Sequence, residues 1–160
     1  MILDKITADK KLRRMALEVA ERNHEANELI LIGIKENGIF IANKIQEYLQ
    51  PVFNGDILLI DLSMDKKKPG EITLSREIDF NDKLILLIDD VANSGRTMLY
   101  ALKPLLKQLP RQVQTLALVE RTHKKFPIAV DYVGLSVSTT LQENIIVEVT
   151  DGEIMGAWMR

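Results

Sequence analysis

Apolar residues in this chain gather in short runs, and the runs predict strands. Four runs have the length and continuity of strands buried on both faces: residues 29–34, 57–60, 84–88 and 114–119. A shorter run follows at residues 132–134. Another, at residues 145–149, is expected to form a strand outside the main sheet.

Three other stretches place apolar residues three and four positions apart, which predicts helices. The first begins near Thr7 and has one apolar face made by Leu12, Met15, Ala16, Val19 and Ala20. The second covers residues 39–49, and the third runs from Arg96 to about Leu109 with a kink at Pro104, which lacks a backbone N–H. Strands alternating with helices predict a mainly parallel sheet in one α/β domain over residues 1–160.

Residues 63–77 interrupt this alternation with a polar stretch that contains three consecutive lysines followed by Pro-Gly. The stretch lacks a sustained apolar period, so it is expected to form a long mobile loop or a hairpin.

Composition narrows the class of protein. The apolar content is 46%, charged residues make up 28%, and the net charge is −2, as in ordinary globular domains and without a general attraction to nucleic acid. There is no cysteine, which excludes disulfides and thiolate metal sites. No signal peptide or membrane-length apolar run is apparent, so a cytoplasmic protein that does not bind membranes is expected.

The strand at residues 84–88 leads into the most informative segment. Asp89 and Asp90 stand where the strand emerges, and a short polar loop and a helix start follow: Asn93, Ser94, Gly95, Arg96 and Thr97. Small residues and hydroxyls before a helix suit a phosphate, because the backbone can approach it and the first helical N–H groups point at it. The two carboxylates need sugar hydroxyls or a divalent metal as partners.

Other protein classes share part of this pattern. Buried strands that end in Asp-Asp also occur in receiver domains and in haloacid-type phosphatases, but those proteins do not continue directly into Ser-Gly-Arg-Thr. A methyltransferase would need a glycine-rich loop after the first strand, and residues 33–38 are a poor match, although Asp61 suits its second strand.

Residues 88–97 resemble the phosphoribosyl-diphosphate (PRPP) signature of the type I phosphoribosyltransferases. Almost the whole chain is similar to the pyrimidine-operon attenuator proteins that double as uracil phosphoribosyltransferases. Further segments match that family in order and spacing: residues 21–23, 31–35, 121–123, 127–128, 131–134 and 151–152. The resemblance implies a twisted, mainly parallel sheet flanked by helices, with a small hood, and a homodimer or higher oligomer.

The resemblance also implies a role for each segment. Asp89 and Asp90 would be catalytic, binding the ribose hydroxyls directly or through Mg²⁺, and residues 93–97 would hold the 5′-phosphate. The pyrophosphate would be met by backbone groups of Lys35, Glu36, Asn37 and Gly38. A lid would carry Lys66, Lys67, Lys68 and Arg76. The base would lie near Glu120, Arg121, Tyr132 and Val133.

Two positions depart from the family pattern. The family usually has an arginine in the pyrophosphate turn, where this chain has Glu36-Asn37, and another where Met64 stands. Both departures bear on catalytic efficiency.

The expected reaction is transfer of the phosphoribosyl group of PRPP to a nucleobase, with uracil favoured. The 6-oxopurine transferases have a lysine donor at the position of Glu120, and an ionised glutamate cannot donate. A purine-base transferase, a regulator that binds nucleotides without turnover, and an RNA-binding attenuator remain the alternatives. RNA binding is disfavoured because Ala129 and Leu135 replace basic residues, leaving Lys35, His123 and Lys124.

Overall fold

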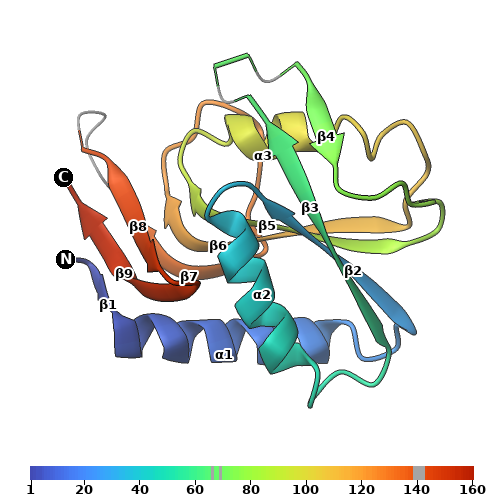
Figure 1. Ribbon diagram of the computed structural model, residues 1–160, viewed down its shortest axis with the longest axis horizontal. Helices are drawn as coiled ribbons and strands as arrows, with labels where there is room; N and C mark the ends of the chain where they lie inside the picture. Colours follow the sequence, from blue (N-terminus) through green and yellow to red (C-terminus); the bar gives the residue numbers. More distant parts are fainter. Residues whose placement is uncertain (66, 69, 139–142) are drawn as a thin grey trace.

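A six-stranded sheet forms the centre of the molecule (Figure 1). The computed structural model describes residues 1–65, 67–68, 70–138 and 143–160. Across the sheet the strands are β4 (Ile72–Leu74), β3 (Asp56–Met64), β2 (Glu28–Ile34), β5 (Leu84–Ala92), β6 (Gln112–Arg121) and β7 (Tyr132–Val137). All neighbouring strands run parallel except β4, which pairs antiparallel with β3. The predicted mainly parallel sheet is confirmed.

Helices cover both faces of this sheet, which explains the continuous apolar runs. Leu116 and Leu118 face α1 (Lys5–Arg22) and α2 (Gly38–Leu49), whereas Ala117 faces α3 (Arg96–Ala101) and the turns that follow it. The inner strands β3, β2, β5 and β6 therefore place alternate residues in two separate apolar clusters. Within the described residues, no helix is long and apolar enough to cross a membrane.

A second, three-stranded antiparallel sheet stands beside the main one, in the order β1 (Leu3–Asp4), β9 (Glu153–Met159) and β8 (Ile145–Thr150). It carries both ends of the chain (Figure 1). Ile145, Val147 and Ala157 are buried in the apolar cluster that also contains α1. The expected strand outside the main sheet is thus confirmed, and it belongs to a small hood.

The first and third helices differ from the prediction at their ends. Helix α1 begins at Lys5, earlier than Thr7, because the Asp4 carboxylate caps it by accepting the Thr7 N–H at 2.7 Å. Helix α3 ends at Ala101 and does not continue through a kink to Leu109. Proline disfavours helical backbone at the preceding residue and cannot donate a hydrogen bond, so only turns follow.

The described ends of the polar stretch at residues 63–77 pair as a hairpin, the second of the two predicted forms. Strand β3 continues to Met64, and Ser63 pairs with Thr73 on β4. Below this pairing, the Ser75 N–H donates to the Asp61 carbonyl at 2.9 Å, and the Ser75 hydroxyl accepts the Asp61 N–H at 2.9 Å. The base of the segment is therefore ordered by backbone pairing.

Candidate active site at the carboxyl edge of the sheet

Three adjacent cavities follow the edge where the parallel strands end. The middle cavity, about 230 Å³, is lined by residues 89–98 from β5 and its loop and by Ile145 from the hood. The cavity beside β2 and β3, about 550 Å³, is lined by residues 35–37, residues 63–65 and Asp90. The cavity beside β6, about 290 Å³, is lined by Asn93, Ser94, Arg121, His123, Lys125 and Asn144. The cavities are neighbours, because Asp90 lines the first two and Asn93 and Ser94 line the middle one and the one beside β6.

The two carboxylates at the end of β5 have different environments. Asp89 is 3% exposed, and its Oδ1 accepts the Asp90 N–H at 2.8 Å. Asp90 is half-buried and lines both the middle cavity and the one beside β2. Both carboxylates therefore line the middle cavity, and Asp90 also lines the cavity beside β2.

A divalent cation fits this pair only as a shared site. Within the described residues there is no group of three or more acidic or histidine side chains that could hold a metal ion. Mg²⁺ commonly takes one or two carboxylates, keeps several waters and shares phosphate oxygens of a substrate. Two carboxylates beside an anion cavity therefore suit Mg²⁺ that arrives with a phosphorylated ligand.

The turn at residues 35–38 lies against the end of β5. A Cβ on Gly38 would stand 2.8 Å from the Ile88 carbonyl oxygen and 3.1 Å from the Asp89 Cα, so a larger residue does not fit. The Lys35–Glu36 peptide bond is cis. The Lys35 N–H donates to the Leu62 carbonyl at 2.8 Å, so it is used within the protein rather than offered to a ligand. That part of the expected pyrophosphate contact is corrected.

Asn37 connects this turn to the hood. Its side-chain amide donates to the Val147 carbonyl of β8 at 2.9 Å. The side chains of Lys35 and Glu36 are exposed at the cavity that Asp90 also lines. The structure therefore brings the turn and the carboxylates together and gives Asn37 a structural bond.

The loop at residues 93–97 lines the middle cavity and leads into α3. Gly95 has φ +87°, a conformation that favours glycine, and it precedes the first turn of α3. The Ser94 hydroxyl accepts the Arg96 N–H at 3.3 Å. The Ser94 carbonyl accepts the N–H groups of Lys125 and Phe126, both at 3.0 Å. The segment after β6 therefore fixes the loop from behind.

Two of the four residues expected near the base lie at the end of β6. Arg121 is buried, lines the cavity beside β6 and donates to the Glu143 carbonyl. The Glu120 carboxylate is engaged within the protein: one oxygen accepts the Lys124 ammonium and the other accepts the Ser136 hydroxyl at 3.1 Å. These two positions are next to the predicted phosphate loop.

Tyr132 and Val133 lie elsewhere, which corrects the expectation for them. Tyr132 opens β7, so at about 3.3 Å per residue it is about 16 Å from the carboxyl end of that strand. The expectation failed because β7 is longer than residues 132–134, and its site-facing end is Val137.

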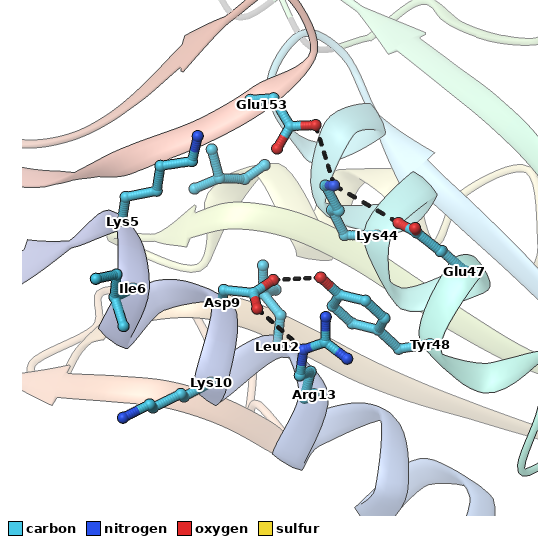
Figure 2. A pocket seen from close by; sticks show the side chains of 11 residues that line it. Lys5, Ile6, Asp9, Lys10, Leu12, Arg13, Lys44, Glu47, Tyr48 and Glu153 are labelled. Atoms are coloured by element: carbon cyan, nitrogen blue, oxygen red, sulfur yellow. Dashed lines mark hydrogen bonds and ion pairs between the residues drawn. The ribbon is translucent and has the colours of Figure 1, made fainter.

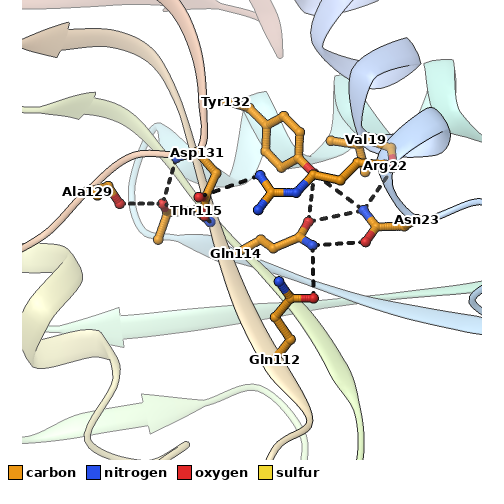
Figure 3. Close-up of polar contacts among 9 residues, drawn as sticks. All are labelled: Val19, Arg22, Asn23, Gln112, Gln114, Thr115, Ala129, Asp131 and Tyr132. Carbon is orange, nitrogen blue, oxygen red and sulfur yellow. Dashed lines mark hydrogen bonds and ion pairs between the residues drawn. The ribbon is translucent and has the colours of Figure 1, made fainter.

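Tyr132 instead belongs to a buried polar cluster under the end of α1 (Figure 3). Its hydroxyl donates to Gln114 Oε1 at 2.7 Å, and the amides of Gln114 and Asn23 exchange hydrogen bonds at 2.9 and 3.0 Å. Burial raises the pKa of Tyr132, so its hydroxyl stays a donor. At the rim, Arg22 pairs with Asp131 at 3.6 Å. The cluster joins α1 to β6 and β7.

The expected lid residues are not gathered at the site. Lys67 and Lys68 are exposed near the hairpin tip, and Lys66 lies outside the described residues. Arg76 follows β4 in the chain. It lines a different cavity, together with Ile72 and Pro104.

Sequence reasoning missed several lining residues. Ser63 and Asp65 come from the end of β3, and Asn144 and Ile145 come from the start of the hood. The length of β3 could have indicated Ser63 and Asp65. No local sequence signal indicates that Asn144 and Ile145 of the hood reach the site.

A further cavity, about 580 Å³, lies away from this edge, between α1, α2 and β9 (Figure 2). Asp9 accepts hydrogen bonds from Arg13 at 2.9 Å and from the Tyr48 hydroxyl, and Lys44 pairs with Glu153 at 3.2 Å. Burial alone would raise the pKa of Asp9, but these hydrogen bonds outweigh it and hold the pKa below its usual value.

Comparison with known proteins places this geometry in a family. A family model described as "Phosphoribosyl transferase domain" matches residues 1–151. "Bifunctional protein PyrR" of Streptococcus pneumoniae is 36% identical over 155 residues, covering 94% of this chain and 90% of that protein.

Solved structures share the fold at lower identity. Hypoxanthine phosphoribosyltransferase of Trypanosoma cruzi has a TM-score of 0.81 at 14% identity, covering 98% of this chain and 94% of that one. A hypoxanthine-guanine phosphoribosyltransferase of Bacillus anthracis has a TM-score of 0.74 at 17% identity, covering 91% and 85%.

Proposed function

This chain belongs to the phosphoribosyl transferase domain family, in its PyrR-like branch, and on that premise we propose that it transfers the 5-phosphoribosyl group of PRPP to a nucleobase. The observation that carries the proposal is the row of three adjacent cavities along the carboxyl edge. Their order matches the three parts of the reaction: pyrophosphate beside β2, ribose 5-phosphate at β5, and base beside β6.

The residues of the middle cavity suit the sugar phosphate. Asp89 and Asp90 would accept hydrogen bonds from the ribose hydroxyls, and their negative charge would stabilise the positive charge that develops on the sugar as pyrophosphate leaves. Mg²⁺ held by these carboxylates and by substrate oxygens would neutralise the leaving pyrophosphate. Ser94 and Thr97 would contribute hydroxyl donors to the 5′-phosphate.

The hairpin of β3 and β4 would act as a lid. The end of β3 contributes Ser63 and Met64 to the cavity assigned to pyrophosphate, and the next residue, Asp65, also lines it. Water would capture the cationic sugar, so closure over this cavity would protect the reaction. Met64 offers no charge to pyrophosphate, and Lys35 is the cation that lines the same cavity.

Uracil is the favoured base in this proposal. The name PyrR of the similar Streptococcus pneumoniae protein and the resemblance to uracil transferases support a pyrimidine. Glu120 also supports it, because its carboxylate is bound to Lys124 and Ser136 and offers no donor to a 6-oxopurine oxygen.

Release of pyrophosphate from PRPP tests the proposal. The protein is incubated with PRPP and Mg²⁺, separately with uracil, hypoxanthine, guanine, xanthine, adenine and orotate. Rapid release with uracil, together with formation of the nucleoside monophosphate, is the expected result. Release with a purine alone would replace the pyrimidine assignment, and no release with any of these bases would contradict the enzymatic proposal.

Tight RNA binding is not part of this proposal. Of the two neutral replacements, Ala129 is exposed, whereas Leu135 is half-buried and packs against the core. Lys124, one of the remaining basic residues, is paired with Glu120. These contacts leave His123 and Lys35 as the exposed basic positions of that set.

A further inference from the structure

We propose that the ion pair between Glu120 and Lys124 is a positioning device for the phosphate loop at residues 93–97. This inference rests on the proposed function, because it assumes that the loop holds the 5′-phosphate of the substrate. It assigns Lys124 an indirect role: the residue fixes the loop from behind instead of touching the ligand.

The pair is well covered at the end of β6. The side chain of Glu120 is 16% exposed and that of Lys124 is 12% exposed. The Lys124 ammonium binds one carboxylate oxygen of Glu120, and the Ser136 hydroxyl donates to the other at 3.1 Å. A charge pair so shielded from water has a fixed geometry and is costly to break from one side.

The segment that contains Lys124 is the one that holds the phosphate loop. Directly after Lys124, the N–H groups of Lys125 and Phe126 both donate to the Ser94 carbonyl at 3.0 Å. A Cβ on Gly95 would lie 3.2 Å from the Phe126 carbonyl oxygen and 3.5 Å from the Lys124 Cδ. Loop and segment are therefore in contact through both backbone and side-chain atoms.

The pair also fixes this segment at its start. The Thr122 N–H donates to the Val137 carbonyl of β7 at 3.0 Å, and four residues after Glu120 the Lys124 side chain returns to the end of β6. The segment is thus closed into a short loop, and this loop contacts Ser94 and Gly95. Removal of the charge pair would free the segment after β6 to move. The hydrogen-bond donors of residues 93–97 would then no longer be held in the orientation that binds a phosphate.

Substitutions at the pair test this inference. Lys124→Met removes the ammonium and keeps the length of the side chain, and Lys124→Arg keeps the charge. The double variant Glu120→Gln/Lys124→Met removes both charges, so it leaves no unpaired buried carboxylate if the single variant fails to fold. Lys83→Met is the matched control, because Lys83 pairs with Glu28 at 3.2 Å at the opposite edge of the sheet.

Two probes separate positioning from general damage. Ribose 5-phosphate reports on the phosphate loop, and pyrophosphate reports on the cavity beside β2, both measured by calorimetry in the presence of Mg²⁺. In Lys124→Met and in the double variant, the Kd of ribose 5-phosphate is expected to rise about tenfold, while that of pyrophosphate changes less than about twofold. Lys124→Arg and Lys83→Met should bind both probes like the wild type.

Other results would overturn the inference. If the wild type binds ribose 5-phosphate and both charge-removing variants bind it equally well, the pair does not position the loop. If the two probes weaken together, the pair acts only on stability. If the wild type itself binds no ribose 5-phosphate, the phosphate assignment in the proposed function is wrong, and the inference falls with it.

Discussion

Two glycines at the candidate site lie where backbone atoms of other segments occupy the space of a side chain. A Cβ on Gly38 would lie 2.8 Å from the Ile88 carbonyl oxygen at the end of β5. A Cβ on Gly95 would lie 3.2 Å from the Phe126 carbonyl oxygen. At both positions the missing Cβ lets a loop approach a strand end, which concentrates backbone groups in a small volume. The identity of single residues therefore decides the shape of the site.

Gly95→Ala is expected to weaken ribose 5-phosphate binding and to lower the free energy of unfolding by about 1–2 kcal/mol, because φ at this position is +87°. The added methyl group also crowds Phe126 and Ile128. Gly152→Ala is the control, since Gly152 has φ +79° in the turn between β8 and β9, where no described residue comes within 4 Å of an added methyl group. Urea unfolding and calorimetry measure both effects; equal ligand binding by Gly95→Ala and the wild type would contradict the phosphate-binding role of this loop.

Asp89→Asn and Asp90→Asn are expected to keep the fold and lose turnover by about a hundredfold or more, because the carboxylate charge serves the sugar and the cation. An asparagine at position 89 can still accept the Asp90 N–H, so the local hydrogen bond is retained. Asp56→Asn, at the opposite edge of the sheet, should keep full activity. Thermal unfolding and pyrophosphate release measure the two properties. Loss of the thermal transition in both site variants would show that the pair is structural.

Among the secondary-structure elements, the hairpin of β3 and β4 is the one whose behaviour the site assignment predicts most directly. β4 pairs with β3 over residues 72–74, at the edge of the main sheet. Such a short edge pairing is a region of low local stability. Strand β4 is therefore suited to move when a ligand fills the neighbouring cavity.

Trypsin is expected to cut after Lys67 rapidly in the free protein and slowly with PRPP and Mg²⁺, whereas Lys68 precedes a proline and is not a trypsin site. Closure over the bound pyrophosphate would protect the tip. Lys107, in the exposed turns after α3, provides an internal control whose cleavage should not depend on the ligand. The lid proposal fails if the tip and Lys107 respond alike.

An element of the fold or site could be predicted from the sequence when the contacts that determine it are local in the chain. The apolar run before Asp89 and the loop up to Thr97 were predictable, because burial and helix start are local properties. The end of α3 also has a local signal, Pro104. The sequence pattern predicts a kink there, whereas the helix ends before this proline. The position of Tyr132 required the length of β7, and the contribution of Ile145 required the packing of the hood, neither of which local patterns reveal.

At the scale of the whole molecule, polar contacts join α1 to α2, and one ion pair joins α2 to the hood. The cavity between α1, α2 and β9 contains Asp9 with Tyr48 and Arg13, and Lys44 with Glu153 (Figure 2). Because the pKa of Asp9 is held low in the folded state, the unfolded chain binds more protons in that pH range. The stabilisation is therefore present above the ordinary aspartate pKa of about 3.9 and lost as the pH falls through the folded value.

Tyr48→Phe is expected to lower stability at neutral pH, and the difference from the wild type should shrink as the pH falls from about 5 to about 3. The variant removes a hydrogen bond that lowers the pKa of Asp9. Other acidic groups are common to both proteins and cancel in the difference. Urea unfolding at several pH values measures it, with Tyr100→Phe on the other face of the sheet as control. A pH-independent difference would contradict this assignment.

The net charge of −2 and the neutral positions near β7 predict no tight binding to a pyrimidine leader RNA, even with uridine monophosphate present. Two missing phosphate contacts correspond to a salt slope smaller by about 1.8. Gel-shift titration at several salt concentrations measures it. Ala129→Arg should strengthen weak association, and Asn54→Arg, which precedes β3 and is four strands away from β7 across the sheet, should not. Nanomolar binding by the wild type in physiological salt would favour the regulator.

The bond between Asn37 and Val147 sets an order on how the site is completed during protein synthesis. The turn, the carboxylates and the phosphate loop all leave the ribosome well before the hood. Yet Ile145 forms part of the middle cavity, Val147 accepts the Asn37 amide, and β9 must pair with β1 at the start of the chain. A nascent chain can therefore form most of the main sheet while translation continues. Its site is complete only after β8 and β9 have left the ribosome.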